Sequence, residues 1–333
     1  MKISGSIYSD KNRALKETVS DLEAHQVDML HVDCNDDVTV FDDIAEIRSW
    51  CNMPIDLHII TETPEKYFDL LRKHPVEYVT FQFEELPDKL EIPADIKGEK
   101  GLAIITPTPI EAFDDYADWD FILMMATIPG QSGGKFDPEN FRKIRSFKKK
   151  YPNKSVHVDG GVNGEVSFIL RNMGVHSSVS GSFLFKGASI GQALMDLTKR
   201  EIESRFKISD FMIPREECPI IDKEGMTLEK VLTSIEEGQL GFTIVEEDNR
   251  MVGIISNADV RKALLKNLSS IEEMDPESMV NENPVTINAE ATVDEMLTEV
   301  RNQSFPVTYL PVIDSDKNAA GIITFVNLIK GEI

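Results

Sequence analysis

Short β-branched runs alternate with longer amphipathic segments over the first 207 residues, and this alternation limits what the chain can fold into. Parallel strands that are joined by crossover helices produce such a pattern. Eight runs are present, at residues 3–8, 28–34, 55–60, 78–83, 102–105, 121–125, 155–159 and 177–180. With seven helical segments between them and a closing helix over 187–205, they predict an α/β fold, a (β/α)8 barrel of the TIM type. A doubly wound open sheet is the alternative.

The rest of the chain repeats itself, and the repeat predicts a second domain. Pro219 is followed eight residues later by Thr227, and 65 residues further along Pro284 is followed by Thr292 at the same spacing. Each block continues through a helix-like stretch, two apolar strands and a Gly-Ile-Ile step, which is an α+β pattern. The predicted domains are a barrel over residues 1–206 and a tandem module over 207–333, with repeats at about 208–267 and 275–333.

Net charge limits the kinds of partner that the chain can bind, and cysteine content indicates its compartment. The chain has 58 acidic and 35 basic residues, and its net charge of −23 repels phosphate backbones and anionic lipid headgroups. We therefore expect neither nucleic acid nor membrane as a partner, and we interpret the basic run at 142–150 as the solvated face of a helix. The three cysteines form no CxxC pair and the start resembles no leader, so we expect a cytoplasmic protein.

Polar residues at the ends of three predicted strands suggest a metal site. Residues two apart in a strand point to the same side, and barrel sites lie at the carboxyl ends of the strands. This selects His31 with Asp33, Asp56 with His58, and Asp159. Two imidazoles and two carboxylates suit one divalent ion, so the predicted ligands are His31, Asp33, His58 and Asp159. Polar residues at strand ends also commonly satisfy loop backbone, which is the alternative for each one.

Glycine-rich stretches follow the sixth, seventh and eighth strands, and their backbone amides could face an anion. The first stretch, residues 129–135, includes Gly130 and Gly133. A second is Gly160-Gly161, and Gly181 with Ser182 follows the last strand. Loops after strands seven and eight often bind phosphate in such barrels, so we expect a phosphorylated substrate. An ordinary flexible loop is the alternative for 129–135.

Together these motifs resemble, in order and spacing, those of the ribulose-phosphate 3-epimerase family over residues 1 to about 205. The resemblance implies a metal-dependent isomerase that inverts C3 of a ketose phosphate through an enediolate, with one bound Zn, Fe, Mn or Co ion. It implies that Asp33 and Asp159 transfer the proton on opposite faces of the substrate while they also contact the metal. The residues that it implies for substrate binding are Ser6, Met125, Gly130, Gly133, Gly160, Gly161, Gly181 and Ser182.

The chain departs from the family's pattern at positions that, by the resemblance, surround the sugar of the substrate. Asn35 and Ile60 stand where the family usually carries methionine, and Gln82 stands where the fourth strand commonly shows histidine. A Thr-Pro-Thr-Pro sequence at 106–109 replaces an asparagine-containing pattern. We therefore expect a substrate other than plain ribulose 5-phosphate, among pentulose or hexulose phosphates.

The C-terminal repeat resembles a tandem pair of cystathionine-β-synthase-type (CBS) domains, which often bind adenine nucleotides. Ser256 and Asp259 match the family's ribose-binding element, and the second repeat offers Thr324 but has Asn327 in place of the aspartate. The resemblance implies AMP, ADP or ATP as a ligand. A structural module that pairs the chain into a homodimer or higher oligomer is the alternative.

Two rival functions stay open at this point. In the first, the barrel has lost turnover and the chain is an adenylate-responsive binding protein. In the second, the barrel is an aldolase or decarboxylase, although no lysine lies on a central strand where an aldolase needs one for a Schiff base.

Overall fold

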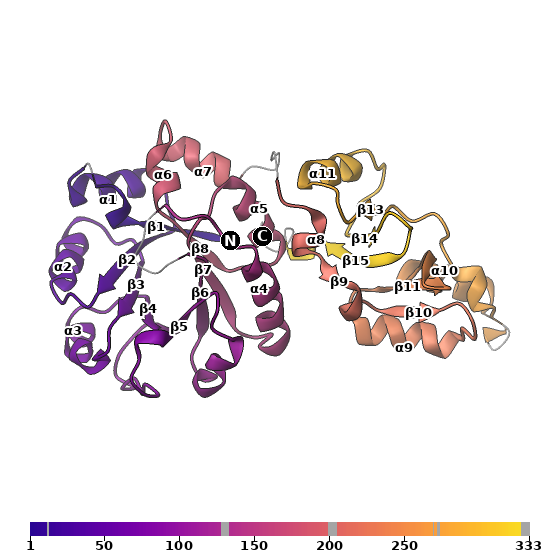
Figure 1. Ribbon diagram of the computed structural model, residues 1–333, viewed down its shortest axis with the longest axis horizontal. Coiled ribbons are helices and arrows are strands. Elements are labelled where there is room, and N and C mark those ends of the chain that lie inside the picture. Colours follow the sequence, from indigo (N-terminus) through magenta and orange to yellow (C-terminus); the bar gives the residue numbers. More distant parts are fainter. Residues whose placement is uncertain (12, 128–132, 199–204, 269, 272–273, 328–333) are drawn as a thin grey trace. The chain divides into compact units, whose positions relative to one another are not determined.

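The computed structural model describes the chain except residues 12, 128–132, 199–204, 269, 272–273 and 328–333 (Figure 1). The described residues fall into two compact units, 1–198 and 205–327. None of the described helices has both the length and the apolar character that crossing a bilayer requires.

Eight parallel strands close into a barrel in chain order, which confirms the predicted (β/α)8 fold of the TIM type. Figure 1 shows these strands with helices packed around them. The strands are β1 (Lys2–Ser6), β2 (Met29–Asn35), β3 (Ile55–Ile60), β4 (Tyr78–Gln82), β5 (Glu99–Ile105), β6 (Phe121–Met125), β7 (Ser155–Asp159) and β8 (Ser177–Ser180). The bounds of β3, β6, β7 and β8 are those predicted, and the other four differ only at their ends.

The helices of the barrel are α1 (Leu15–Ala24), α2 (Val40–Trp50), α3 (Phe68–Lys73), α4 (Glu139–Lys150), α5 (Gly164–Asn172), α6 (Ser182–Lys186) and α7 (Ile190–Thr198). Short 3-10 helices η1 (Ile7–Ser9) and η2 (Pro64–Tyr67) follow β1 and precede α3. The predicted closing helix over 187–205 is shorter, because Gly187 is extended and separates α6 from α7. Its last part, 199–204, lies outside the described residues.

Two connections of the barrel hold no α-helix among their described residues. β4 leads into a single 3-10 turn, η3 (Phe83–Glu85), and β5 leads into a longer 3-10 helix, η4 (Ile110–Tyr116). Pro87 follows η3. Proline lacks the backbone N–H that an α-helix interior needs, so η3 does not continue as one. The prediction of an ordinary helical segment after β4 is therefore wrong.

The buried interior of the barrel is divided between an apolar and a polar part. An apolar cluster comes mainly from β5 and β6, and it consists of Met29, Tyr78, Ala103, Phe121, Leu123 and Met125. Buried polar side chains come from β1 to β4, β7 and β8, and they include Ser4, His31, Asp56, His58, Thr80, Gln82, His157 and Ser178. A buried polar group without a hydrogen-bond partner costs free energy, so the pairing among these side chains determines how the site is built.

The second unit contains two sheets with the same order of elements, which confirms the predicted tandem α+β repeat. One sheet has β10 (Ile220–Asp222), β11 (Phe242–Glu247) and β12 (Arg250–Ser256), and the other has β13 (Ile287–Asn288), β14 (Tyr309–Ile313) and β15 (Ala319–Thr324) with β9 (Ile213–Pro214) at its edge. The helices are α8 (Ile208–Phe211), α9 (Leu228–Gly238), α10 (Asn257–Lys266) and α11 (Val293–Arg301), with 3-10 turns η5 (Arg215–Glu217) and η7 (Pro276–Met279).

The chain enters this unit through the sheet of the second repeat. The Ile208 amide donates to the Ala291 carbonyl, the Ser209 amide donates to the Ala289 carbonyl, both at 2.9 Å, and β9 pairs antiparallel with β15. Residues that precede the first repeat therefore complete the second. The two repeats are interlocked, because removing residues 208–214 would take a strand from the other repeat's sheet.

One aromatic stack joins the repeats. The rings of Phe242 and Tyr309 lie 3.8 Å apart at an interplanar angle of 15°. Around them, Ile244, Ile254 and Ile322 form a buried cluster that draws on both sheets. Neither repeat could bury this face alone, so the pair forms one folding unit.

Capping boxes start a helix in each repeat. Thr292 accepts a hydrogen bond from the Glu295 amide, and the Glu295 carboxylate accepts one from the Thr292 amide. Ser256 and Asp259 form the same arrangement at α10. Each box satisfies two backbone groups that the helix leaves unpaired at its start.

We expect Thr292→Ala to lower the free energy of unfolding of the second unit by about 1 kcal/mol, because the α11 cap is lost. Thr298→Ala, at an exposed position in the middle of α11, should cost nothing, since alanine favours helix there. Urea unfolding followed by far-UV circular dichroism would measure this. Trp50 and Trp119 both lie in the barrel, so the tryptophan fluorescence transition should not move. An equal loss from both substitutions would contradict the capping argument.

Candidate metal centre and its surroundings

The four predicted metal ligands converge at the carboxyl end of the barrel. His31, Asp33, His58 and Asp159 each offer one ligand atom, and these atoms all lie within 4.8 Å of one another. The register of the sheet explains part of this, since Asp33 on β2 is paired with His58 on β3. The donor set, two imidazoles and two carboxylates, fits a divalent ion such as Zn²⁺, Fe²⁺ or Mn²⁺.

The His31 ring is oriented by a buried carboxylate. Its Nδ1 lies 2.8 Å from Asp56 Oδ2, which also accepts a hydrogen bond from the Ser4 hydroxyl at 3.0 Å. A carboxylate accepts hydrogen bonds, so Nδ1 carries a proton toward Asp56, and Nε2 is the nitrogen that faces the site, 3.1 Å from Asp33 Oδ1 and 3.9 Å from Asp159 Oδ2. Such a carboxylate partner fixes the orientation of a metal-binding histidine and raises its basicity.

His58 presents its other nitrogen to the site. Its Nε2 lies 2.9 Å from Gln82 Oε1, and the buried Nδ1 makes no hydrogen bond of ordinary geometry within the described part of the chain. Asp33 Oδ1 lies 3.5 Å from this Nδ1. A buried nitrogen normally has a hydrogen-bond partner. His58 Nδ1 has none among the described residues and faces two carboxylates and a second imidazole, which is the environment expected of a metal-binding nitrogen. The residues therefore fit the ion that their chemistry predicts.

The two aspartates differ from the histidines in exposure and from each other in proton affinity. Both histidine side chains are fully buried, whereas the side chains of Asp33 and Asp159 are 20% and 19% exposed, so a substrate could reach the carboxylates. Burial raises the pKa of Asp159 above its usual range, against the opposing charge of His31. Burial also acts on Asp33, but the charge and hydrogen bond of His31 outweigh it and lower the pKa.

Glycines at the end of β7 let the backbone pass close to a neighbouring loop. Gly160 and Gly161 have φ angles of +108° and +67°, and a Cβ on Gly160 would lie 2.3 Å from the hydroxyl of Thr127. A side chain is excluded at Gly160 by both space and backbone conformation. These glycines directly follow Asp159, so their positions depend on the strand that carries a predicted ligand.

The other residues predicted for substrate binding lie around the same end of the barrel. Ser6 ends β1 beside Gly181, where a Cβ on the glycine would lie 3.2 Å from the Ser6 Cβ, and the Ser9 hydroxyl donates to Ser6 Oγ at 3.0 Å. Ser182 begins α6. Met125 ends β6 and is buried in the apolar cluster of the interior. Gly133 has a φ of +91°, and Gly130 lies outside the described residues.

The sequence alone does not identify the partners of the ligands. In the sequence, Asp56 stands out only as the neighbour of His58, and Gln82 only as a departure from a family pattern. The structure shows that each holds one imidazole, and that Ser4 and Glu84 hold them in turn. The i, i+2 spacing of Asp56 and His58 on β3 was the available signal for Asp56.

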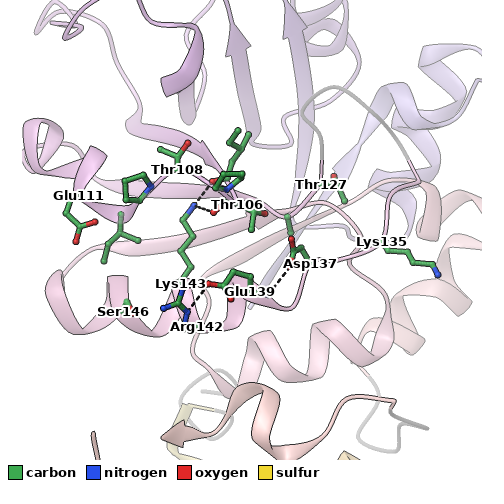
Figure 2. A pocket seen from close by; sticks show the side chains of 15 residues that line it. Thr106, Thr108, Glu111, Thr127, Lys135, Asp137, Glu139, Arg142, Lys143 and Ser146 are labelled. Carbon is green, nitrogen blue, oxygen red and sulfur yellow. Dashed lines mark hydrogen bonds and ion pairs between the residues drawn. The ribbon is translucent and has the colours of Figure 1, made fainter. Parts of the chain in front are cut away.

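A separate cavity of about 830 Å³ lies beside the site, between the end of β5, η4 and α4 (Figure 2). Lys143 reaches into it from α4 and donates to the carbonyls of Ile105 and Thr106 at 2.5 and 3.2 Å. Lys143 is only 9% exposed, so the prediction of a solvated face at 142–150 is wrong at this residue. Burial lowers the pKa of the Lys143 ammonium to about 8, against the opposing charges of Glu84 and Glu139.

This burial predicts a pH dependence of stability. The ordinary pKa of lysine is 10.5, so between about pH 8 and 10.5 the unfolded chain binds more protons than the folded one. The free energy of unfolding should therefore rise with pH in this window, and Lys143→Met should remove that rise. Urea unfolding by tryptophan fluorescence at a series of pH values would measure the difference. Lys73→Met, on the exposed side of α3, is the control, and the same pH dependence in both variants would contradict the interpretation.

In the second unit, the residues predicted for nucleotide binding occupy matching positions in the two repeats. Ser256 ends β12 opposite Phe242, and Thr324 ends β15 opposite Tyr309. Asp259 Oδ2 accepts hydrogen bonds from the hydroxyl and amide of Ser256 at 2.5 and 3.1 Å. Burial tends to raise the pKa of Asp259, but these hydrogen bonds outweigh it and lower the pKa, so a charged acceptor stands at the start of α10.

The fold and the donor set together define the N-terminal unit as a (β/α)8 barrel with a candidate metal centre at its carboxyl end. The model of the "Ribulose-phosphate 3 epimerase family" matches residues 2–185, and the model of the "CBS domain" matches residues 208–266 and 277–332. Because the first match covers more than half of the chain, the chain belongs to the ribulose-phosphate 3-epimerase family. A tandem CBS pair follows the barrel in the sequence.

Among curated relatives, ribulose-phosphate 3-epimerase of Bacillus subtilis is 27% identical over 212 residues, which cover 59% of this chain and 98% of the relative. The enzyme of the same name from Methanocaldococcus jannaschii is 28% identical over 227 residues, which cover 64% of this chain and 95% of the relative.

Among solved structures, CBSX2 in complex with AMP matches with 21% identity and a TM-score of 0.32, over 38% of this chain and 96% of that chain. The CbpB protein of Listeria monocytogenes in complex with c-di-AMP matches with 20% identity and a TM-score of 0.32, over 38% of this chain and 93% of that chain.

Proposed function

We propose that this chain is a metal-dependent epimerase that inverts C3 of a ketose phosphate. The convergence of His31, Asp33, His58 and Asp159 at the mouth of the barrel is the observation that carries the proposal. Membership of the epimerase family and the likeness to two named epimerases over nearly their full lengths support it. One divalent ion held by these residues would stabilise the negative charge that develops on the substrate's oxygens.

The two carboxylates are suited to opposite halves of the proton transfer. Asp33 is on β2 and Asp159 is on β7, with β1 and β8 between them in the closed barrel, so they approach a bound sugar from different sides. One carboxylate takes the proton from C3 as the C–H bond breaks, and the electron pair moves into the enediolate. The other, protonated, returns its proton to C3 on the opposite face. The centre is inverted, and no oxidant or reductant is consumed.

The substrate's phosphate would bind where the β7 and β8 loops meet. Gly160 and Gly161 follow Asp159, and Gly181 and Ser182 follow β8, so backbone amides and one hydroxyl lie on the side of the barrel next to Asp159. Ser6 adjoins Gly181 and completes this side. These roles are supported by position alone and define the residues to test.

The wild-type chain should exchange the C3 hydrogen of a ketose phosphate for solvent deuterium in the presence of Zn²⁺, Fe²⁺, Mn²⁺ or Co²⁺. Asp159→Asn should lower kcat by about 10²–10⁴-fold, because it removes one proton-transferring group. Proton NMR over a panel of pentulose and hexulose phosphates would measure both. Asp88→Asn, at an exposed loop position, is the matched control.

The panel also separates the competing functions. Exchange with a pentulose or hexulose phosphate identifies the substrate class, and the relative kcat/KM values decide between chain lengths. If the chain binds a sugar phosphate but exchanges no C3 hydrogen with any of the four metals, the binding-protein alternative is favoured instead.

We also propose that the second unit binds an adenine nucleotide through Ser256 and Asp259. Support comes from the CBS family match and from the charged Asp259 carboxylate that the capping box holds at the start of α10. Thr324 offers a hydroxyl at the matching position, but Asn327 lacks the charge that strengthens a hydrogen bond to a ribose hydroxyl. Assembly into a homodimer or higher oligomer stays a prediction, to which exposed Leu232 and Leu265 lend support.

AMP, ADP or ATP should raise the melting temperature of the second unit, with about 2.7 kcal/mol of stabilisation at a hundredfold excess over Kd. Asp259→Ala should abolish the shift. It also breaks a capping box, so Glu295→Ala, which breaks a box of the same type at α11, is the matched control and should keep the shift. Calorimetry of the full chain would measure both. A shift that survives Asp259→Ala would remove this residue from the site.

A further inference from the structure

We infer that Gln82 and Glu84 act as a positioning pair that determines which nitrogen of His58 faces the metal. The inference rests on the metal site of the proposed function and concerns residues to which that function gives no role. Gln82 ends β4, and Glu84 lies in η3, the short 3-10 turn that replaces the expected helix after this strand. The pair therefore lies at one of the two connections where the described fold departs from the regular barrel pattern.

A chain of hydrogen bonds connects Glu84 at the surface, through Gln82, to the predicted ligand His58. Glu84, an exposed residue, accepts hydrogen bonds from the Ile105 amide at 3.1 Å and from the Thr108 hydroxyl. Gln82 is 2% exposed and donates its amide N–H to the Glu84 carboxylate, with a longer contact of 3.4 Å to the Ala103 carbonyl. The Oε1 of Gln82 lies 2.9 Å from His58 Nε2.

The donor and acceptor requirements of these groups fix the order of atoms. A carboxylate only accepts hydrogen bonds, so the Gln82 end that faces Glu84 must be the NH₂ group. The amide oxygen then faces His58 and accepts from Nε2–H. A neutral imidazole carries one proton, so Nδ1 keeps its lone pair, and this is the nitrogen aimed at Asp33 and the other ligands. If the amide were reversed, it would direct an N–H at Nε2 and favour the tautomer that cannot bind the metal through Nδ1.

The two histidines are therefore held by partners of different charge. His31 donates to the Asp56 carboxylate, whereas His58 donates to a neutral amide whose orientation depends on a carboxylate one step further away. Because the orientation of His58 depends on Glu84, it can be tested by substituting an exposed residue. Thr108, which bonds to Glu84, is one of the residues that line the cavity in Figure 2.

Zn²⁺ affinity is the first test, measured by competition with a chromophoric chelator and independent of turnover. Gln82→Met keeps the size of the side chain but removes the acceptor, and we expect a fall in affinity of about 10–100-fold. Glu84→Ala should lower affinity less, because Gln82 can still adopt the correct orientation part of the time. The double variant should bind like Gln82→Met alone, because Glu84 acts only through Gln82. Glu85→Ala, on the same turn, is the control and should bind like the wild type.

The tautomer itself is the second test. In Zn²⁺-loaded protein with ¹⁵N-labelled histidine, long-range ¹H–¹⁵N spectra should show His58 protonated at Nε2 in the wild type and in Glu85→Ala. The same signal should weaken or broaden in Glu84→Ala, which a purely structural role for this exposed residue would not produce. If Gln82→Met does not fold, Glu84→Ala alone decides the question through both measurements.

The outcomes separate this inference from the function on which it rests. Wild-type affinity and an unchanged His58 tautomer in Glu84→Ala would overturn the positioning role while leaving the metal site intact. Additive losses from Gln82→Met and Glu84→Ala would overturn it as well, since the two residues would then act separately. A wild-type chain that binds no Zn²⁺ and exchanges no deuterium would overturn the proposed function instead.

Discussion

Each of two fully buried imidazoles needs a hydrogen-bond partner on the nitrogen that faces away from the site. Leaving such a group unpaired in the interior would cost about 1–3 kcal/mol. The protein meets this requirement with Asp56 for His31 and Gln82 for His58. Those partners need partners of their own, which are Ser4 and the Glu84 carboxylate. Two chains of hydrogen bonds therefore run through the polar interior of strands β1 to β4, one through Ser4, Asp56 and His31 and the other through Glu84, Gln82 and His58.

The parallel register makes this network possible. His31 is paired with Asp56 and Asp33 with His58 across β2 and β3, so the two ligands on β2 lie beside the two polar residues of β3. Side chains alternate along a strand, and a slip of one residue would turn all four away from the interior. Closure of the barrel then brings β7 and its Asp159 to the same end, where β6 and β7 are held together by the pairing of Met125 with Asp159.

The second unit is built on a different constraint. Each repeat has an apolar face that it cannot bury alone, and the stacked Phe242 and Tyr309 lie where the two faces meet. The entry segment adds β9 to the sheet of the second repeat, so the unit is interlocked rather than assembled from two separable halves. The same repetition places Ser256 and Thr324 at matching strand ends, while the difference between Asp259 and Asn327 makes the two positions chemically unequal.

The sequence by itself determined the strands, the repeat and the donors. Eight β-branched runs became eight strands because burial on both faces selects such residues, and the i, i+2 spacing on β2 and β3 already put His31, Asp33 and His58 on one side. The tertiary structure decided what surrounds them. Gln82 orients His58 across 24 residues, and Lys143 turns inward to the Ile105 carbonyl across 38 residues. Glu84 lies two residues from Gln82, but its own position depends on Ile105 and Thr108, 21 and 24 residues away. These contacts depend on the packing of neighbouring strands and loops. Local propensity and spacing report which face a residue occupies, but the partner on that face is set by the packing of strands and loops that are distant along the chain.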